Sequence, residues 1–166
     1  MADIAADGPF SAFPGVERWF VVLSGTGVSL AFPGGDRVIR AGDPPLRFDG
    51  GAAPGCRLLE GPTRDLNLML RDSSGVMAQV DPGVAWDAGF ARRGLFTAVA
   101  GRWSCAGEVR RLGAHSLLWE DVSDAGDWRF EPDDPGVRAG GLVSPPKMYR
   151  YRYVNSPESG SQSRSM

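Results

Sequence analysis

A short alternating segment, residues 65–70 (DLNLML), carries the side chains in this 166-residue chain that are best suited to recognising a small molecule. In an extended strand alternate side chains share a face, so Asp65, Asn67 and Met69 point one way and three leucines the other. The polar face offers a carboxylate, an amide and a thioether, which suit a partly buried pocket. The same polar groups could instead bond to neighbouring loops, because buried polar groups need partners with or without a ligand. Both interpretations stay open here.

Arg18 is a second candidate, because a planar guanidinium can bind a carboxylate through two parallel hydrogen bonds. An exposed position or an ion pair within the protein is the alternative. The preceding segment, residues 8–15 (GPFSAFPG), has prolines that fix φ and glycines that permit a tight reversal. Its Phe10 and Phe13 either plug one end of a barrel or line a ligand pocket toward which Ser11 points. Ser11 is not predicted to be a nucleophile, because the chain has no GxSxG elbow and no plausible histidine partner.

Metal chemistry is not expected. A metal site of the usual kind needs several imidazoles and a carboxylate, whereas His115 is the one histidine of the chain. We expect no metal, no cofactor and no catalytic residue. Cys56 and Cys105 form neither a CxxC clip nor a disulfide framework, and we interpret them as free thiols in a reducing compartment. The Gly-Thr-Gly at residues 25–27 is not a phosphate loop, because it lacks GxGxxG spacing and a following helix.

Composition restricts the partners. Eighteen Lys and Arg against 20 Asp and Glu give a formal net charge of −2, which favours neither nucleic acid nor an anionic membrane. No apolar run approaches the ~20 residues of a membrane span, and the N-terminus lacks the regions of a signal peptide. We therefore expect a cytoplasmic protein that could form a homodimer. The basic pairs at 92–93 and 110–111 are predicted to lie on the surface, and the five tryptophans in the core or at an interface.

The candidate residues must be positioned by short strands, because 23 glycines and 13 prolines interrupt the chain repeatedly. No window shows a long apolar period of 3.6 residues with caps, so we expect little helix. Aromatic and β-branched runs between turn residues predict strands at residues 18–23, 28–32, 36–39, 46–48, 57–59, 66–70 and 76–80.

An approximate internal repeat indicates two related β-modules. Residues 20–25 (FVVLSG) resemble 96–101 (FTAVAG), and the next similar pairs are 38–42 (VIRAG) with 109–113 (VRRLG) and 46–48 (LRF) with 117–119 (LLW). We predict a first module at 1–80, a second, shorter module at 81–122 packed on it, and an irregular tail at 123–166. The alternation at 149–153 (YRYRY) fits either one strand or a segment of a loose tail. The last ten or so residues are expected to be disordered, since they hold little apolar surface.

Three segments together resemble the HutD/Ves family: residues 7–18 (DGPFSAFPGVER), 23–27 (LSGTG) and 61–69 (GPTRDLNLM). The resemblance covers about residues 1–120. It implies an all-β, cupin-type fold (an RmlC-like jelly roll) arranged as a bicupin, in agreement with the repeat. Relative to the family the chain is short at its N-terminus, where an upstream Trp-Lys-Asn-Gly-Gly-Gly type motif is missing, so the first module is expected to lack its opening strands.

The resemblance also implies a function. It points to a metal-independent cupin with a regulatory or accessory role in histidine utilisation or in a stress response. The implied ligand is a small acidic or formylated metabolite, for which the candidate contacts are Phe10, Ser11, Phe13, Arg18, Asp65, Asn67 and Met69. One alternative is a metal-independent isomerase or lyase acting on a small organic acid, with Asp65 as base and Arg18 as anchor. The other is a non-catalytic interaction protein, and we favour a protein that is not an enzyme.

Overall fold

Strands make up nearly all the regular structure of this protein in a computed structural model, which describes residues 1–86, 92–120, 126–134 and 148–155. Within these residues the one helix is a single 3₁₀ turn, η1 (Gly50–Ala52). The all-β prediction is confirmed. Each of the seven predicted strands overlaps an observed strand, because alternating apolar residues between turn residues favour half-buried extended chain.

The first module consists of two antiparallel sheets that use residues 2–71. One sheet has the order β1 (Ala2–Ile4), β8 (Thr63–Arg71), β3 (Val16–Ser24), β6 (Leu46–Asp49). The other has the order β2 (Gly8–Pro9), β7 (Gly55–Leu58), β4 (Val28–Phe32), β5 (Gly35–Ile39).

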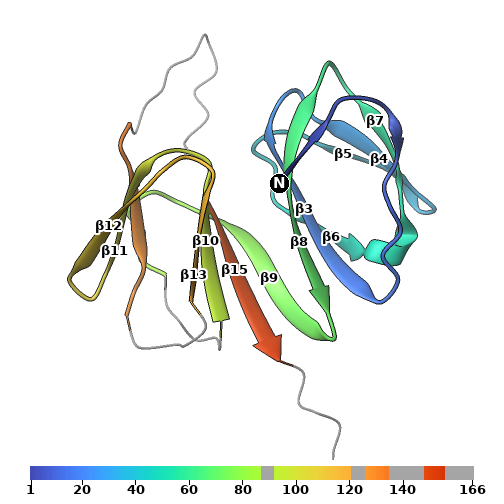
Figure 1. The fold of residues 1–166 in the computed structure, drawn as a ribbon. Coiled ribbons are helices and arrows are strands. Elements are labelled where there is room, and N and C mark those ends of the chain that lie inside the picture. Colours follow the sequence, from blue (N-terminus) through green and yellow to red (C-terminus); the bar gives the residue numbers. More distant parts are fainter. Residues whose placement is uncertain (87–91, 121–125, 135–147, 156–166) are drawn as a thin grey trace, which may run out of the picture.

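The second module repeats this plan beside the first (Figure 1). Its larger sheet has the order β9 (Ser73–Val80), β15 (Met148–Asn155), β10 (Arg92–Thr97), β13 (Ser116–Glu120). The smaller sheet has the order β12 (Glu108–Leu112), β11 (Gly101–Cys105), β14 (Arg129–Pro132). β9 thus corresponds to β1, β15 to β8, β10 to β3 and β13 to β6, so the internal repeat has a structural counterpart.

The residue-by-residue match of the repeat is wrong by one position. Phe20 lies inside the first module, whereas Phe96 faces the first module from outside the second core, and Leu95 takes the inner place. Likewise Leu118 packs on the second core while Leu117 is exposed. Side chains alternate along a strand, so a shift of one residue reverses the face of every side chain.

Strand pairing also divides the chain differently from the predicted boundaries. β9 hydrogen-bonds to β15, so the second module begins at residue 73 rather than 81. β14 and β15 belong to its sheets, so much of the predicted tail is paired, and the tyrosine-arginine alternation forms a strand between β9 and β10. The pairings of β15 join residues that are 51–82 positions apart in sequence, which local patterns do not reveal. Residues 156–166, the expected disordered end, lie outside the described residues.

Three apolar clusters hold the described residues together. One fills the first module around Phe20 and Leu30, and one fills the second around Leu95 and Phe130. The third lies between the modules, where side chains of β3 and β8 meet those of β9 and β10: Val21, Leu66, Met77 and Phe96. The outer leucines of β8 therefore attach the first module to the second, which leaves the polar face of β8 directed inward.

The turn after β3 fixes where β8 begins. Gly27 has a φ of 114°, and a Cβ there would lie 2.3 Å from the carbonyl oxygen of Ile39. Thr63, the first residue of β8, donates from its hydroxyl to the Gly27 carbonyl at 3.3 Å. Only glycine permits the close approach to Ile39, and the separate hydrogen bond from Thr63 to Gly27 positions the start of the strand that carries Asp65.

Candidate functional site

Arg18 lies on the inner face of β3 and is only 6% exposed. The alternation of β3 directs Arg18, Phe20 and Val22 into the module. The guanidinium carbon lies 4.3 Å from the ring centroid of Phe10 and 5.5 Å from that of Phe48. Two aromatic rings thus pack on a charged group that is largely removed from water, and their electron-rich faces stabilise its charge.

Asn67 connects Arg18 to Asp65. The Nε of Arg18 donates to Oδ1 of Asn67 at 2.7 Å, and Nδ2 of Asn67 donates to Oδ1 of Asp65. β3 and β8 are neighbouring strands, so their inward side chains meet across the ladder. Asn67 therefore orients Arg18 and Asp65, and its own amide is occupied by protein atoms.

Among the residues that the structure describes, none accepts a hydrogen bond from the terminal nitrogens of Arg18. A guanidinium has five N–H donors, and among the described residues the one from Nε is the donor that is bonded. The terminal nitrogens Nη1 and Nη2 therefore present an unused pair of parallel donors. Asp65 influences Arg18 through its charge, but no ion pair joins the two side chains within the part of the chain that the structure describes.

Burial shifts the acid–base properties of this site. Asp65 is 2% exposed, and burial raises the pKa of its carboxyl to about 6 even though the charge of Arg18 opposes the shift. Burial lowers the pKa of Arg18, and Asp65 partly restores it. The thiol of Cys56, buried in the first core, has a raised pKa, chiefly because of burial and then because of the carboxylates of Asp7 and Asp65. The site is therefore a desolvated arrangement of opposite charges.

The structure brings together four of the seven residues proposed from sequence: Phe10, Arg18, Asp65 and Asn67. Met69 lies opposite Arg18 across the ladder and is 41% exposed, so it lies at the open end of the polar face. The remaining two do not join the group.

Ser11 is exposed, and Phe13 is half-buried against η1, where its amide donates to the Gly50 carbonyl at 2.9 Å. The rigid turn therefore presents Phe10 but not Ser11 to the arginine. Sequence analysis missed Phe48, although the alternation of residues 46–48 placed its ring on the same face as Leu46. We define the Arg18 site as Phe10, Arg18, Phe48, Asp65 and Asn67.

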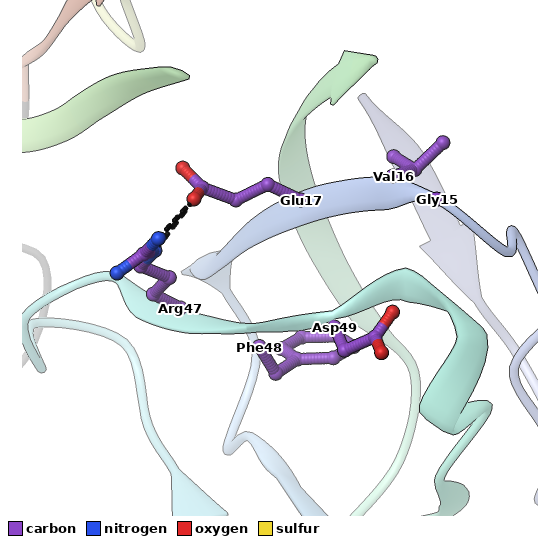
Figure 2. A pocket seen from close by; sticks show the side chains of 6 residues that line it. All are labelled: Gly15, Val16, Glu17, Arg47, Phe48 and Asp49. Carbon is purple, nitrogen blue, oxygen red and sulfur yellow. Dashed lines mark hydrogen bonds and ion pairs between the residues drawn. The ribbon is translucent and has the colours of Figure 1, made fainter. Parts of the chain in front are cut away.

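A surface groove of about 490 Å³ adjoins the Arg18 site (Figure 2). Figure 2 shows Glu17 and Arg47 reaching toward each other from β3 and β6, and the Nε of Arg47 donates to Glu17 at 2.8 Å. The indole of Trp19 donates to the same carboxylate at 2.9 Å. Arg18 and Asp65 do not line this groove, but Phe48 belongs both to the groove and to the Arg18 site. Phe48 therefore separates the buried guanidinium from an open surface.

The described residues contain no cluster of three His, Cys, Asp or Glu side chains close enough to hold a metal ion. His115 lies in the turn before β13 with a φ of 58°, and its ring stacks on Phe96 at 6.4 Å. In the same residues, no helix is long and apolar enough to span a bilayer. Both described cysteines, Cys56 and Cys105, are free thiols.

Two related antiparallel β-modules enclosing separate cores define a protein of the cupin type. This chain belongs to the HutD family, whose model matches residues 1–134. The fold and the family expected from the sequence are thereby confirmed. None of the curated proteins matches the chain.

Solved structures agree with this assignment. The conserved protein of unknown function PA5104 from Pseudomonas aeruginosa PAO1 is 25% identical with a TM-score of 0.79, over 93% of this chain and 80% of that one. HutD from Pseudomonas fluorescens SBW25 is 22% identical with a TM-score of 0.73, over 93% of this chain and 77% of that one. A salicylate 1,2-dioxygenase variant from Pseudoaminobacter salicylatoxidans is 9% identical with a TM-score of 0.54, over 90% of this chain and 69% of that one. At this identity the similarity shows the fold alone.

Proposed function

We propose that this protein is a cytoplasmic, metal-independent cupin that binds a small acidic metabolite at the Arg18 site. The observation that carries the proposal is the pair of terminal nitrogens of Arg18, on a guanidinium that packs against two rings, with no acceptor among the described residues. A carboxylate matches the spacing of two parallel N–H donors, and charge-assisted bonds of this kind are strong where water is excluded.

The surroundings of Arg18 favour a small, planar ligand. Phe10 and Phe48 pack against the guanidinium, so a ligand can hydrogen-bond to it only along its edge. The hydrogen bond to Asn67 restricts rotation of the Arg18 side chain. The carboxyl group of Asp65 accepts from the other side of the same Asn67 amide. When Asp65 is ionised, its charge repels a second anion near Arg18. A single small carboxylate such as formate meets these constraints.

The physiological role proposed for this binding is regulation of, or assistance to, histidine utilisation, and a stress-response role is the alternative within the family. Membership of the HutD family supports the first.

Calorimetric titration tests the binding proposal. Formate, N-formylglutamate and urocanate are titrated separately into the full chain, into Arg18→Gln, and into the control Arg102→Gln. Arg102 is a solvent-exposed arginine paired with Glu131, so its loss leaves the Arg18 site intact. We expect binding of at least one acid, a loss of tenfold or more in Arg18→Gln, and no change in the control. Equal affinity in all three proteins, or no heat from any acid with folded protein, would contradict the proposal.

One observation favours a catalytic alternative. A carboxyl group with a pKa of about 6 is suited to accept a proton near neutral pH, so Asp65 could act as a base on an acid anchored by Arg18. Turnover of a bound acid that is abolished in Asp65→Asn, with binding retained, would establish that function. Binding without turnover keeps the protein among non-catalytic cupins.

A further inference from the structure

The outer face of β13 exposes two large apolar side chains. Leu118 packs on the second core, so Leu117 and Trp119, its neighbours along the strand, point to the opposite face. Leu117 is 58% exposed and Trp119 is 42% exposed, which is the surface that remains after every contact within the chain. Tryptophan is highly buried on average in folded proteins, so its exposure next to an exposed leucine requires an explanation. We call Leu117 and Trp119 the β13 patch.

The β13 patch continues the apolar layer between the two modules. Leu117 lies opposite Phe96 across the ladder of β13 and β10, and Phe96 belongs to the cluster between the modules. The first module covers this face of the sheet at Met77 of β9 and Phe96 of β10, which are 2% and 5% exposed. On β13 the same face stays accessible. The patch is therefore the uncovered margin of an apolar surface that already forms an interface within the chain.

The equivalent strand of the first module is charged at the corresponding places. β6 corresponds to β13, and its Leu46 and Phe48 pack on the first core. The residues that alternate with them, Arg47 and Asp49, are exposed on the outer face. Charged side chains on an edge strand discourage its pairing with another chain. The β13 patch has leucine and tryptophan where β6 carries this protection.

β13 also has a free hydrogen-bonding edge. It is the last strand of its sheet and pairs with β10 alone among the residues that the structure describes. At such an edge the N–H and C=O groups of alternate residues point away from the sheet, and a strand of another chain can bond to them. Residues 116–119 (SLLW) carry no charge, and Glu120 ends the strand. An apolar face beside an unpaired and mainly uncharged edge favours the addition of a strand.

We propose that β13 joins two copies of this chain, with the two β13 strands paired antiparallel about a two-fold axis at Leu118. This register places Leu117 of each copy opposite Trp119 of the other, and residue 116 opposite residue 120. Each apolar side chain of the patch thus meets an apolar side chain, and no like charges are placed opposite each other. The strand is complementary to itself in this arrangement, so a second copy fits it by symmetry.

The orientation of the axis brings the two patches together. A two-fold axis that relates two antiparallel strands of one sheet is perpendicular to that sheet, so the outer faces of both copies lie on the same side. The two patches then form one apolar group that lies between the two first modules and is partly removed from water. The contact uses five residues a side, against roughly 20–30 in a standard interface, so we expect a weak dimer with a Kd of about 10–500 µM. This dimer does not depend on acid binding at Arg18, which lies in the first module.

Sedimentation equilibrium of the full chain, from about 10 µM to about 1 mM, measures the association. The proteins compared are the wild type, Leu117→Lys and the matched control Val109→Lys. Val109 is 64% exposed and lies on β12, another edge strand, so its replacement adds the same charge outside the patch. Because both sites are exposed, both variants should keep the urea midpoint of the wild type. We expect Leu117→Lys to weaken the dimer tenfold or more and Val109→Lys to leave it unchanged.

Hydrogen exchange of the wild type locates the contact without any substitution. Amides of residues 116–120 should exchange more slowly at about 1 mM than at about 10 µM, whereas those of β12 should exchange equally at both concentrations. A monomer at every concentration would overturn the proposal. So would a dimer that Leu117→Lys leaves intact or that gives β13 no protection, because its interface would lie elsewhere. Assemblies larger than a dimer would also overturn it, since a two-fold contact closes at two copies.

Discussion

Asp65 is expected to make the stability of this protein fall as the pH rises from 5 to 7, and Asp65→Asn to remove that dependence. The folded protein holds the Asp65 proton up to a pKa of about 6, whereas an unfolded chain releases it near 3.8. Between these values the native state binds more protons than the unfolded state. Raising the pH therefore favours unfolding, and the stabilisation by the proton is lost once the pH passes about 6.

The magnitude follows from the two pKa values. At pH 5, proton binding by Asp65 stabilises the native state by the free energy that corresponds to about one pH unit. At pH 7 it contributes almost nothing to the free energy of unfolding. Integrating the linkage between these conditions gives a loss of about 1 kcal/mol in the free energy of unfolding. The full effect, from strongly acidic to neutral solution, is about 3 kcal/mol. Because Asp65 is 2% exposed, solvent screening does little to reduce it.

Urea unfolding followed by tryptophan fluorescence at pH 5, 6 and 7 measures this effect. Asn keeps the oxygen that accepts from Asn67, so the variant removes the charge with little change in shape. The free energy of unfolding of Asp65→Asn minus that of the wild type should increase by about 1 kcal/mol from pH 5 to pH 7. Asp3→Asn is the matched control, because Arg64 lowers the pKa of Asp3 and leaves it ionised throughout this range. A constant difference for Asp65→Asn would refute the reasoning.

Three further outcomes are expected. Gly27→Ala should destabilise the protein by about 2–4 kcal/mol in urea unfolding, because its φ and a nearby carbonyl exclude a Cβ; an unchanged midpoint would contradict this. Leu30→Ala, at a fully buried site of the first core, should lower the free energy of unfolding by about 2–5 kcal/mol in the same measurement. A loss below about 1 kcal/mol would contradict this, because it would mean that neighbouring side chains close the cavity. Carboxylate affinity at Arg18, measured calorimetrically, should rise as the pH falls from 7 to 5, because protonation of Asp65 removes its repulsion of the ligand. An affinity that does not change with pH would show that the charge of Asp65 does not act on the ligand.

Much of the Arg18 site could be predicted because strands alternate. The period of two in residues 65–70 correctly put Asp65 and Asn67 on one face and Leu66 and Leu68 on the other. The residue type of Arg18 also led us to expect carboxylate recognition, and that expectation stays a prediction. Phe48 was missed, because nothing near it in sequence shows that β6 pairs with β3 and brings this ring to the guanidinium.

Other features needed the pairing of distant strands. The segment at 148–155 lies between β9 and β10, so a stretch that resembled a tail is a central strand. Arg93 looked like part of a surface basic pair, yet the closure of the second module buries it among tryptophans. Each of these depends on which segments meet in space, and local composition carries no information about that.

The sequence by itself determined where the chain extends and turns, which face of residues 65–70 is apolar, that the plan is used twice, and which family the chain belongs to. These properties follow from local periodicity, turn residues and motif spacing, which act over a few residues. The tertiary structure alone decided the register between distant strands, the contacts of the Arg18 guanidinium and the raised pKa of Asp65. Those arise from burial and from partners brought together across the chain, because both the dielectric environment and the hydrogen-bond acceptors of a side chain exist only once the fold has closed.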